Sequence, residues 1–163
     1  MKYAKIINND ILNGEGVCVS LWLQGCPHHC PNCHNPELWE SGGIEEKDDI
    51  LFQKISNAIQ ANGIQRNFSI LGGEPLADYP NPNIVYSKKI LKYIKQNFPN
   101  IKTYVWTGYT IEELKQKYGN DIDKILKNID VLIDGRYDET QRDITLKLRG
   151  SKNQRVLRKN IDF

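Results

Sequence analysis

Long hydrophobic runs are absent from this sequence of 163 residues. None approaches the ~20 consecutive apolar residues that a membrane-spanning helix needs. The sequence opens with neither an apolar leader nor an Arg-rich transit segment, and it contains no repeat, linker or low-complexity stretch. We therefore expect a single domain over residues 1–163, located in the cytoplasm and without a membrane partner.

Cysteine is scarce, with four residues in the whole chain. A chain of this length needs no disulfides to hold its core, and cytoplasmic thiols stay reduced, so a disulfide framework fits the pattern less well than a metal site. Three of the four cysteines nevertheless fall within eight residues, as Cys26, Cys30 and Cys33 in C-x3-C-x2-C spacing. Thiolates this close together can all bind one metal centre. The fourth, Cys18, lies upstream on an expected strand.

The cysteine spacing leaves three interpretations open. A four-iron cluster takes one thiolate for each iron, so three cysteines would leave one iron free for a small molecule. A Cys3His zinc site could recruit His28, His29 or His34, although structural zinc sites usually have two separated C-x2–4-C halves and this sequence has no second pair. Inert cysteines are the third interpretation.

Acidic residues are missing from the tail, whereas the rest of the chain mixes both signs to give a formal net charge of +2. Residues 147–159 carry six basic side chains and no acid. A basic tail can bind nucleic acid or an acidic partner. Since no aromatic residue is interleaved for base stacking, we interpret the tail as a solvated surface and expect no nucleic-acid partner.

Strand patterns alternate with helix patterns along the chain. Residues 17–24 alternate with a period of two, and short apolar runs follow at 68–71, 102–106 and 129–133. Helices are predicted at 45–61, 83–97, 110–118 and 121–128, the third opened by a capping box of Thr110 and Glu113. Residues 1–10 predict an edge strand or extended arm, and residues 144–157 two further strand segments. The alternation predicts an α/β fold with a mostly parallel sheet and right-handed crossovers.

Unusual residues follow each of the four expected parallel strands. Because parallel strands end at one edge of a sheet, these segments should lie together. Glycines in the second segment would let the backbone approach a ligand closely, and Glu74 could accept hydrogen bonds from an ammonium group. A tight turn before a helix explains the same glycines. The segments are the cysteine loop, Gly72-Gly73-Glu74-Pro75, Thr107-Gly108-Tyr109 and Asp134-Gly135-Arg136.

The cysteine loop and the Gly-Gly-Glu segment together resemble the radical S-adenosylmethionine (radical SAM) superfamily. Within it, the chain is similar to the activating proteins of anaerobic (class III) ribonucleoside-triphosphate reductases. His34 departs from the tyrosine frequent in that family, and Asn32 from the aromatic residue frequent in the superfamily. The matching stretches run nearly end to end: residues 10–14, 25–35, 71–75, 105–109, 131–136 and 149–154.

The resemblance implies a fold and two cofactors. The fold would be a partial, open β/α barrel, because a complete barrel needs about 250 residues. Cys26, Cys30 and Cys33 would hold a 4Fe-4S cluster, with SAM on the open iron. The resemblance also assigns the SAM contacts: backbone around Asn32, Cys33 and His34 at the adenine end, and Gly72 and Gly73 with Glu74 at the amino group.

Two further side chains are expected near SAM. We expect the guanidinium of Arg136 at the SAM carboxylate, with a surface salt bridge as the alternative role, and the Thr107 hydroxyl facing SAM. Asp134 and Arg136 form an acid-x-base pair in the sequence. We expect no general acid, base or protein nucleophile, because the cofactors carry the chemistry.

The implied activity is reductive cleavage of SAM, in which the 5′-deoxyadenosyl radical takes a hydrogen atom from a glycine of the reductase. The implied partners are that reductase and a small electron donor protein such as a flavodoxin. Three alternatives stay open: an activase of another glycyl radical enzyme, a small radical SAM enzyme acting on a metabolite such as a deazapurine synthase, and a non-enzymatic zinc-binding interaction module.

Overall fold

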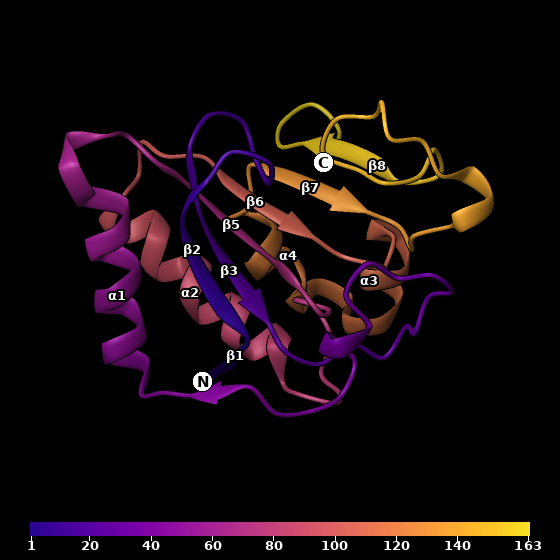
Figure 1. The fold of residues 1–163 in the computed structure, drawn as a ribbon, viewed down its shortest axis with the longest axis horizontal. Helices are drawn as coiled ribbons and strands as arrows, with labels where there is room; N and C mark the ends of the chain where they lie inside the picture. The colour runs from indigo at the N-terminus through magenta and orange to yellow at the C-terminus, as the bar shows by residue number, and fades with distance from the viewer.

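An open six-stranded sheet forms the centre of the computed structural model, which describes residues 1–163 (Figure 1). The four central strands are parallel, and the two edge strands run antiparallel to them. This confirms the predicted α/β class with a mostly parallel sheet that does not close into a barrel. The spatial order is β2 (Lys5–Asp10), β3 (Cys18–Leu23), β5 (Asn67–Gly72), β6 (Thr103–Trp106), β7 (Val131–Asp134) and β8 (Arg155–Arg158).

Helices connect the parallel strands and lie on one face of the sheet (Figure 1). The predicted capping box is confirmed, since Thr110 Oγ1 accepts from Glu113 N while the Glu113 carboxylate accepts from Thr110 N. No helix is both long and apolar enough to cross a bilayer. The helices are α1 (Asp48–Gln60), α2 (Asn83–Asn97), α3 (Ile111–Tyr118) and α4 (Asp123–Leu126), with 3-10 turns η1 (Pro36–Leu38), η2 (Ala61–Gly63), η3 (Gly119–Asp121) and η4 (Glu139–Gln141).

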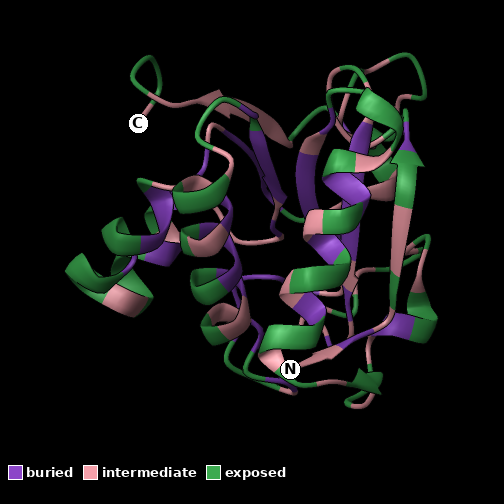
Figure 2. Ribbon diagram, turned by 90° about the vertical axis from the view of Figure 1, so that its left-hand side faces the viewer, coloured by how far each residue is buried: buried purple, intermediate pink, exposed green.

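Apolar side chains between the sheet and the helices form the core, and the helices turn their exposed sides outward (Figure 2). Alternate residues of β3, such as Leu21 and Leu23, pack in the same cluster as Leu51 and Ile55 of α1 and are fully buried. Each such side chain stabilises the fold by roughly 1.5–3 kcal/mol. The apolar face of strand β3 and the apolar face of helix α1 thus pack against each other in one core.

The opposite face of the sheet carries a row of large side chains. In the parallel register Trp22 of β3 lies beside Leu71 of β5, and Trp106 of β6 lies beside Ile133 of β7. Ile70 pairs with Val105, so Leu71 and Trp106 are the next positions along their strands. This row lies near the carboxyl ends of the strands, where the motifs follow.

Three predicted elements differ from the structure, one of them the helix over 121–128, which is reduced to α4 after the 3-10 turn η3. Helix α1 begins at Asp48 because Ile44–Glu45 form β4, which pairs with β1 (Lys2–Tyr3). The segment before Gly150 forms no strand, only one isolated bridge between Arg142 and Ser151, while β8 follows it. Asp143 stands immediately before this segment and accepts a hydrogen bond from Thr145 N, and this turn competes with a strand ladder.

Candidate functional site

A cavity of about 540 Å³ lies at the carboxyl ends of the parallel strands. All three clustered cysteines line it, and so do Gly72, Gly73, Glu74 and Thr107 from the ends of β5 and β6. The row of Trp22, Leu71 and Trp106 supplies an apolar wall. The structure therefore brings the cysteine loop and all three of the other strand-end segments, the last of them through Gly135, to one cavity.

The cysteine loop leaves β3 through a pair of backbone hydrogen bonds to η1 and its cap. Gly25 N donates to Leu38 O at 2.9 Å, and Cys26 N donates to Trp39 O at 2.9 Å. The loop then turns tightly, with Cys33 N donating to Cys30 O at 3.1 Å. All three thiols are free and half-buried. A short, closed loop thus presents three thiols to the cavity.

The donor set suits an iron–sulfur cluster. Soft thiolates are the usual ligands of such clusters. Burial raises the pKa of the Cys26 thiol to about 12, with the His28 and His29 N–H groups acting the other way, and burial also raises the pKa of Cys30. Cys26 and Cys30 are therefore protonated at neutral pH, and a metal that binds them must displace their protons.

A ready-made zinc site is not present. No three His, Cys, Asp or Glu side chains converge as a single ion requires. Each nearby histidine also has another contact: His28 with Glu74, His29 stacked on Trp39 with ring centroids 4.7 Å apart, and His34 with Tyr137 at 5.1 Å. The three cysteines of a four-iron cluster bind three different irons, so they need not meet at one point.

Gly72 and Gly73 hold the end of β5 against the start of the cysteine loop. Gly73 N donates to Leu23 O and Glu74 N donates to Gly25 O, both at 2.8 Å. Gly72 has φ +109°, and a Cβ there would lie 2.7 Å from Leu23 N; a Cβ on Gly73 would overlap the Gly25 carbonyl. Because Gly72 and Gly73 have no side chains, the backbone of Leu23 and Gly25 can pack directly against them.

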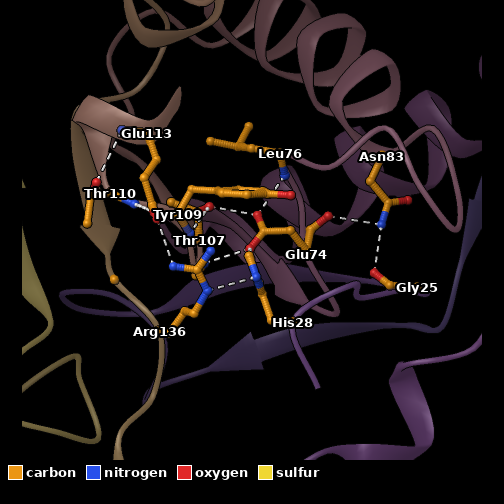
Figure 3. A network of polar contacts seen from close by, with 12 residues as sticks. Gly25, His28, Glu74, Leu76, Asn83, Thr107, Tyr109, Thr110, Glu113 and Arg136 are labelled. Carbon is orange, nitrogen blue, oxygen red and sulfur yellow. Dashed lines mark hydrogen bonds and ion pairs between the residues drawn. The ribbon is translucent and has the colours of Figure 1, made fainter. Parts of the chain in front are cut away.

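Glu74 is fully buried, and its carboxylate accepts four hydrogen bonds (Figure 3). Oε1 accepts from Thr107 Oγ1 at 2.7 Å and from Leu76 N at 2.9 Å. Oε2 accepts from Gly108 N at 2.6 Å and lies 2.9 Å from His28 Nε2. The carboxylate therefore joins β5's end, β6's end and the cysteine loop.

The other predicted SAM contacts are placed as follows. Thr107 is buried and lines the cavity, with its hydroxyl on Glu74. Cys33 and His34 line the cavity, whereas Asn32 is exposed, with φ +57°, outside the lining. Arg136 is also outside the lining: its Nη1 donates to Glu113 Oε1 at 2.9 Å and its Nε to His28 Nδ1 at 3.2 Å. The ion pair with Glu113 is the alternative role considered for Arg136.

Asp134 pairs with Arg155 instead of Arg136. The sequence pattern of an acid and a base two residues apart suggested a pair, but neighbours at that spacing on a strand end need not meet. The Asp134 carboxylate is fully buried and accepts from Arg155 Nη2 at 2.5 Å. It also accepts from Ile111 N at 2.9 Å, which satisfies the N-terminus of α3.

Sequence reasoning missed a wall of the cavity formed by the tail. Arg149, Gln154 and Leu148 line the cavity. Gln154 fixes this wall: its Oε1 accepts from Gly150 N at 2.9 Å and its Nε2 donates to Gly135 O at 3.0 Å. The sequence did contain a signal for this wall. Residues 149–154 are one of the stretches that match the family, but no role was assigned to them.

Two indole N–H groups at the cavity have no acceptor in the chain. Trp22 and Trp39 both line the cavity, and the Nε1 atom of each is buried and unpaired. Buried donors normally have partners, so these groups suit a ligand that brings acceptor oxygen, nitrogen or sulfur atoms. A cluster with its sulfides and a nucleotide both meet that description.

Comparison with known proteins gives one consistent result. The family model described as a 4Fe-4S single cluster domain matches residues 12–157. Three relatives carry the name anaerobic ribonucleoside-triphosphate reductase-activating protein. The one from Haemophilus influenzae is 33% identical over 97% of this chain and 98% of its own length. The relative from Escherichia coli strain K12 is 32% identical over 96% of this chain and 97% of its own length. The relative from Enterobacteria phage T4 is 33% identical over 96% of this chain and 93% of its own length.

Proposed function

The chain belongs to the anaerobic ribonucleoside-triphosphate reductase-activating proteins, and on that premise we propose that it is a radical SAM enzyme that installs the glycyl radical of such a reductase. One observation carries the proposal. Three free thiols from one short loop line the same cavity as the Gly72-Gly73-Glu74 segment and Thr107. That combination would give the protein a cluster site and a SAM site in the same cavity.

Cys26, Cys30 and Cys33 would hold the 4Fe-4S cluster, with one iron left without a protein ligand. When bound, the cluster supplies the electron that splits SAM into methionine and a 5′-deoxyadenosyl radical, which removes a hydrogen atom from the α-carbon of a reductase glycine. The protein itself would position the cluster and SAM and exclude water from them. The apolar wall of Trp22, Leu71 and Trp106 would exclude water from the bound cofactors.

The SAM contacts follow the strand ends. Backbone around Asn32, Cys33 and His34 would contact the adenine end, and the backbone of Gly72 and Gly73 the amino group. Thr107 would lie next to SAM. Arg136 is proposed for the carboxylate, because only two of its five N–H groups are used by Glu113 and His28.

The cavity is open to solvent on one side, so a large partner could close it. Exposed apolar side chains flank that side, with Leu12 78% exposed and Ile144 85% exposed, and both line the cavity. We place the glycine-bearing segment of the reductase there. The electron donor would be a small protein such as a flavodoxin, and the site of action the cytoplasm.

Electron paramagnetic resonance tests this function. Reconstituted protein is incubated anaerobically with SAM, a reductant and the anaerobic reductase, and the expected result is a glycyl radical doublet that requires all components. Formate-lyase-type glycyl radical enzymes are the comparison substrates. A doublet on those enzymes alone would assign the chain to another activase, and intact SAM in every mixture would overturn the proposal.

A further inference from the structure

The buried carboxylate of Glu74 has no acceptor position to spare. Its side chain is 1% exposed, and its two oxygens take four hydrogen bonds from Thr107, Leu76, Gly108 and His28. A carboxylate offers about four lone-pair sites, so these donors use all of them. An ammonium group could bond this carboxylate only by displacing one of the four.

His28 is the donor that reaches Glu74 from the cysteine loop. It stands between Cys26 and Cys30, and its side chain is 6% exposed. Arg136 Nε always carries a hydrogen, so His28 Nδ1 must be the acceptor of that bond, at 3.2 Å. Nε2 is then the ring nitrogen that donates to Glu74. The two bonds fix the ring's tautomer and its orientation.

The space for His28 is shaped by Gly108 and Tyr109. A Cβ on Gly108 would lie 2.5 Å from His28 Cδ2 and 3.3 Å from Glu74 Oε2. The Tyr109 ring meets the imidazole edge-on, with centroids 4.4 Å apart. Glycine at position 108 therefore leaves the room that the imidazole occupies in its present position beside the end of β6.

From His28 the hydrogen bonds continue to the end of β7 and to helix α3. Arg136 follows β7 and pairs with Glu113, the third residue of α3, at 2.9 Å. The network of Glu74, His28, Arg136 and Glu113 thus links the cysteine loop to the ends of β5, β6 and β7 (Figure 3). All four strand-end segments are joined through two residues, Glu74 and His28.

We infer that Glu74 and His28 are positioning residues that hold the cysteine loop in register with the strand ends, and that the Glu74 carboxylate is not a ligand of the SAM ammonium. This inference rests on the proposed function, because the position of the cysteine loop relative to the strand ends would set the position of the cluster relative to SAM. The ammonium is left to the backbone of Gly72 and Gly73.

The first test uses the metal-free protein and needs no activity. Hydrogen exchange of residues 26–35 and 107–109 is compared in wild type, H28F, H28Q and H29F. We expect faster exchange in H28F, and partial rescue in H28Q, whose amide nitrogen can still donate to Glu74. H29F is the matched control, because His29 is exposed and stacks on Trp39 without touching Glu74. Nitrogen-15 spectra should place the His28 proton on Nε2.

A second variant leaves both positioning residues in place. In G108A the added methyl displaces the imidazole from Glu74, so the same segments should exchange faster. Unchanged exchange in both H28F and G108A would overturn the inference. Circular dichroism checks that each variant keeps its helices and strands.

The third test separates positioning from binding. E74Q loses two of the four acceptor sites, so we expect a lower iron content and faster loop exchange before SAM is added. SAM affinity per loaded cluster should stay near the wild-type value. The opposite result, normal iron content and exchange with SAM affinity reduced about tenfold or more, would make Glu74 a ligand and refute the inference. Should wild type bind no cluster, the proposed function fails, but the exchange results still decide the role of His28.

Discussion

The guanidinium of Arg155 holds the buried carboxylate of Asp134, with Nη2 2.5 Å from Oδ2 and Nε 2.9 Å from Oδ1. Asp134 ends β7 and also accepts from the first N–H of α3. Arg155 begins β8, the edge strand that follows the tail wall of the cavity. One carboxylate therefore joins β7, β8 and α3 beside the site.

R155A should destabilise the fold by about 1–3 kcal/mol, because it leaves a buried carboxylate without its charged partner. Denaturant unfolding measures this free energy. R158A is the matched control: Arg158 lies on the same strand and pairs with Glu15, which is 43% exposed, so its loss should cost less than ~1 kcal/mol. Equal effects of the two substitutions would contradict the role given to Asp134.

Acid stability should depend on Glu15. Hydrogen bonds from Arg158 and Lys102 lower the pKa of Glu15 from 4.5 to about 2. A depressed folded-state pKa means that the contribution to stability is complete above pH 4.5 and is lost as the pH falls toward 2. The unfolding free energies of wild type and E15Q should therefore differ at neutral pH and converge across that interval.

Denaturant titrations at several pH values measure the convergence. E37Q serves as the control, since Glu37 is exposed and forms none of the ion pairs in the structure. A gap between wild type and E15Q that stays constant down to pH 2 would contradict the assigned shift.

Substituting the loop cysteines should abolish the cluster. C26S, C30S and C33S each remove one of three thiol ligands, and we expect their iron content and visible absorbance to fall to background after anaerobic reconstitution. C18A is the control, because Cys18 is buried on β3 outside the cavity lining. Loss of iron in C18A with retention in C30S would reverse the assignment.

SAM affinity should depend on Arg136. If its fork binds the carboxylate, R136A raises the dissociation constant of SAM about tenfold in cluster-loaded protein. R136K keeps the charge without the planar fork and should lie between. K147A controls for net charge, since Lys147 is exposed outside the cavity lining. An R136A protein with wild-type affinity would leave Arg136 only its bonds to Glu113 and His28.

Much of the fold could be predicted because its signals are local. The period of two on β3 and the capping box of Thr110 and Glu113 both lie within a few residues. Alternation of strands and helices then implies parallel strands, and parallel strands bring their following segments to one edge. The meeting of the cysteine loop with Gly72 and Gly73 follows from this step alone.

The rest depends on contacts between distant residues. The Glu74 carboxylate accepts hydrogen bonds from residues 28, 76, 107 and 108, and two of these donors are backbone N–H groups. A pattern of side chains in the sequence cannot predict a backbone donor. Arg155 meets Asp134 only through the antiparallel register of β7 and β8. The pattern of residues 144–149 predicts a strand, but Asp143 just before them accepts from Thr145 N and forms a turn instead.

Mössbauer spectroscopy of protein reconstituted with iron-57 tests the central claim most directly, namely that three thiols hold a four-iron cluster with one iron open to SAM. We expect four irons per chain, and addition of SAM should change the signal of one iron while three stay as they were. Four irons that all ignore SAM would contradict the claim, as would a colourless protein that retains zinc.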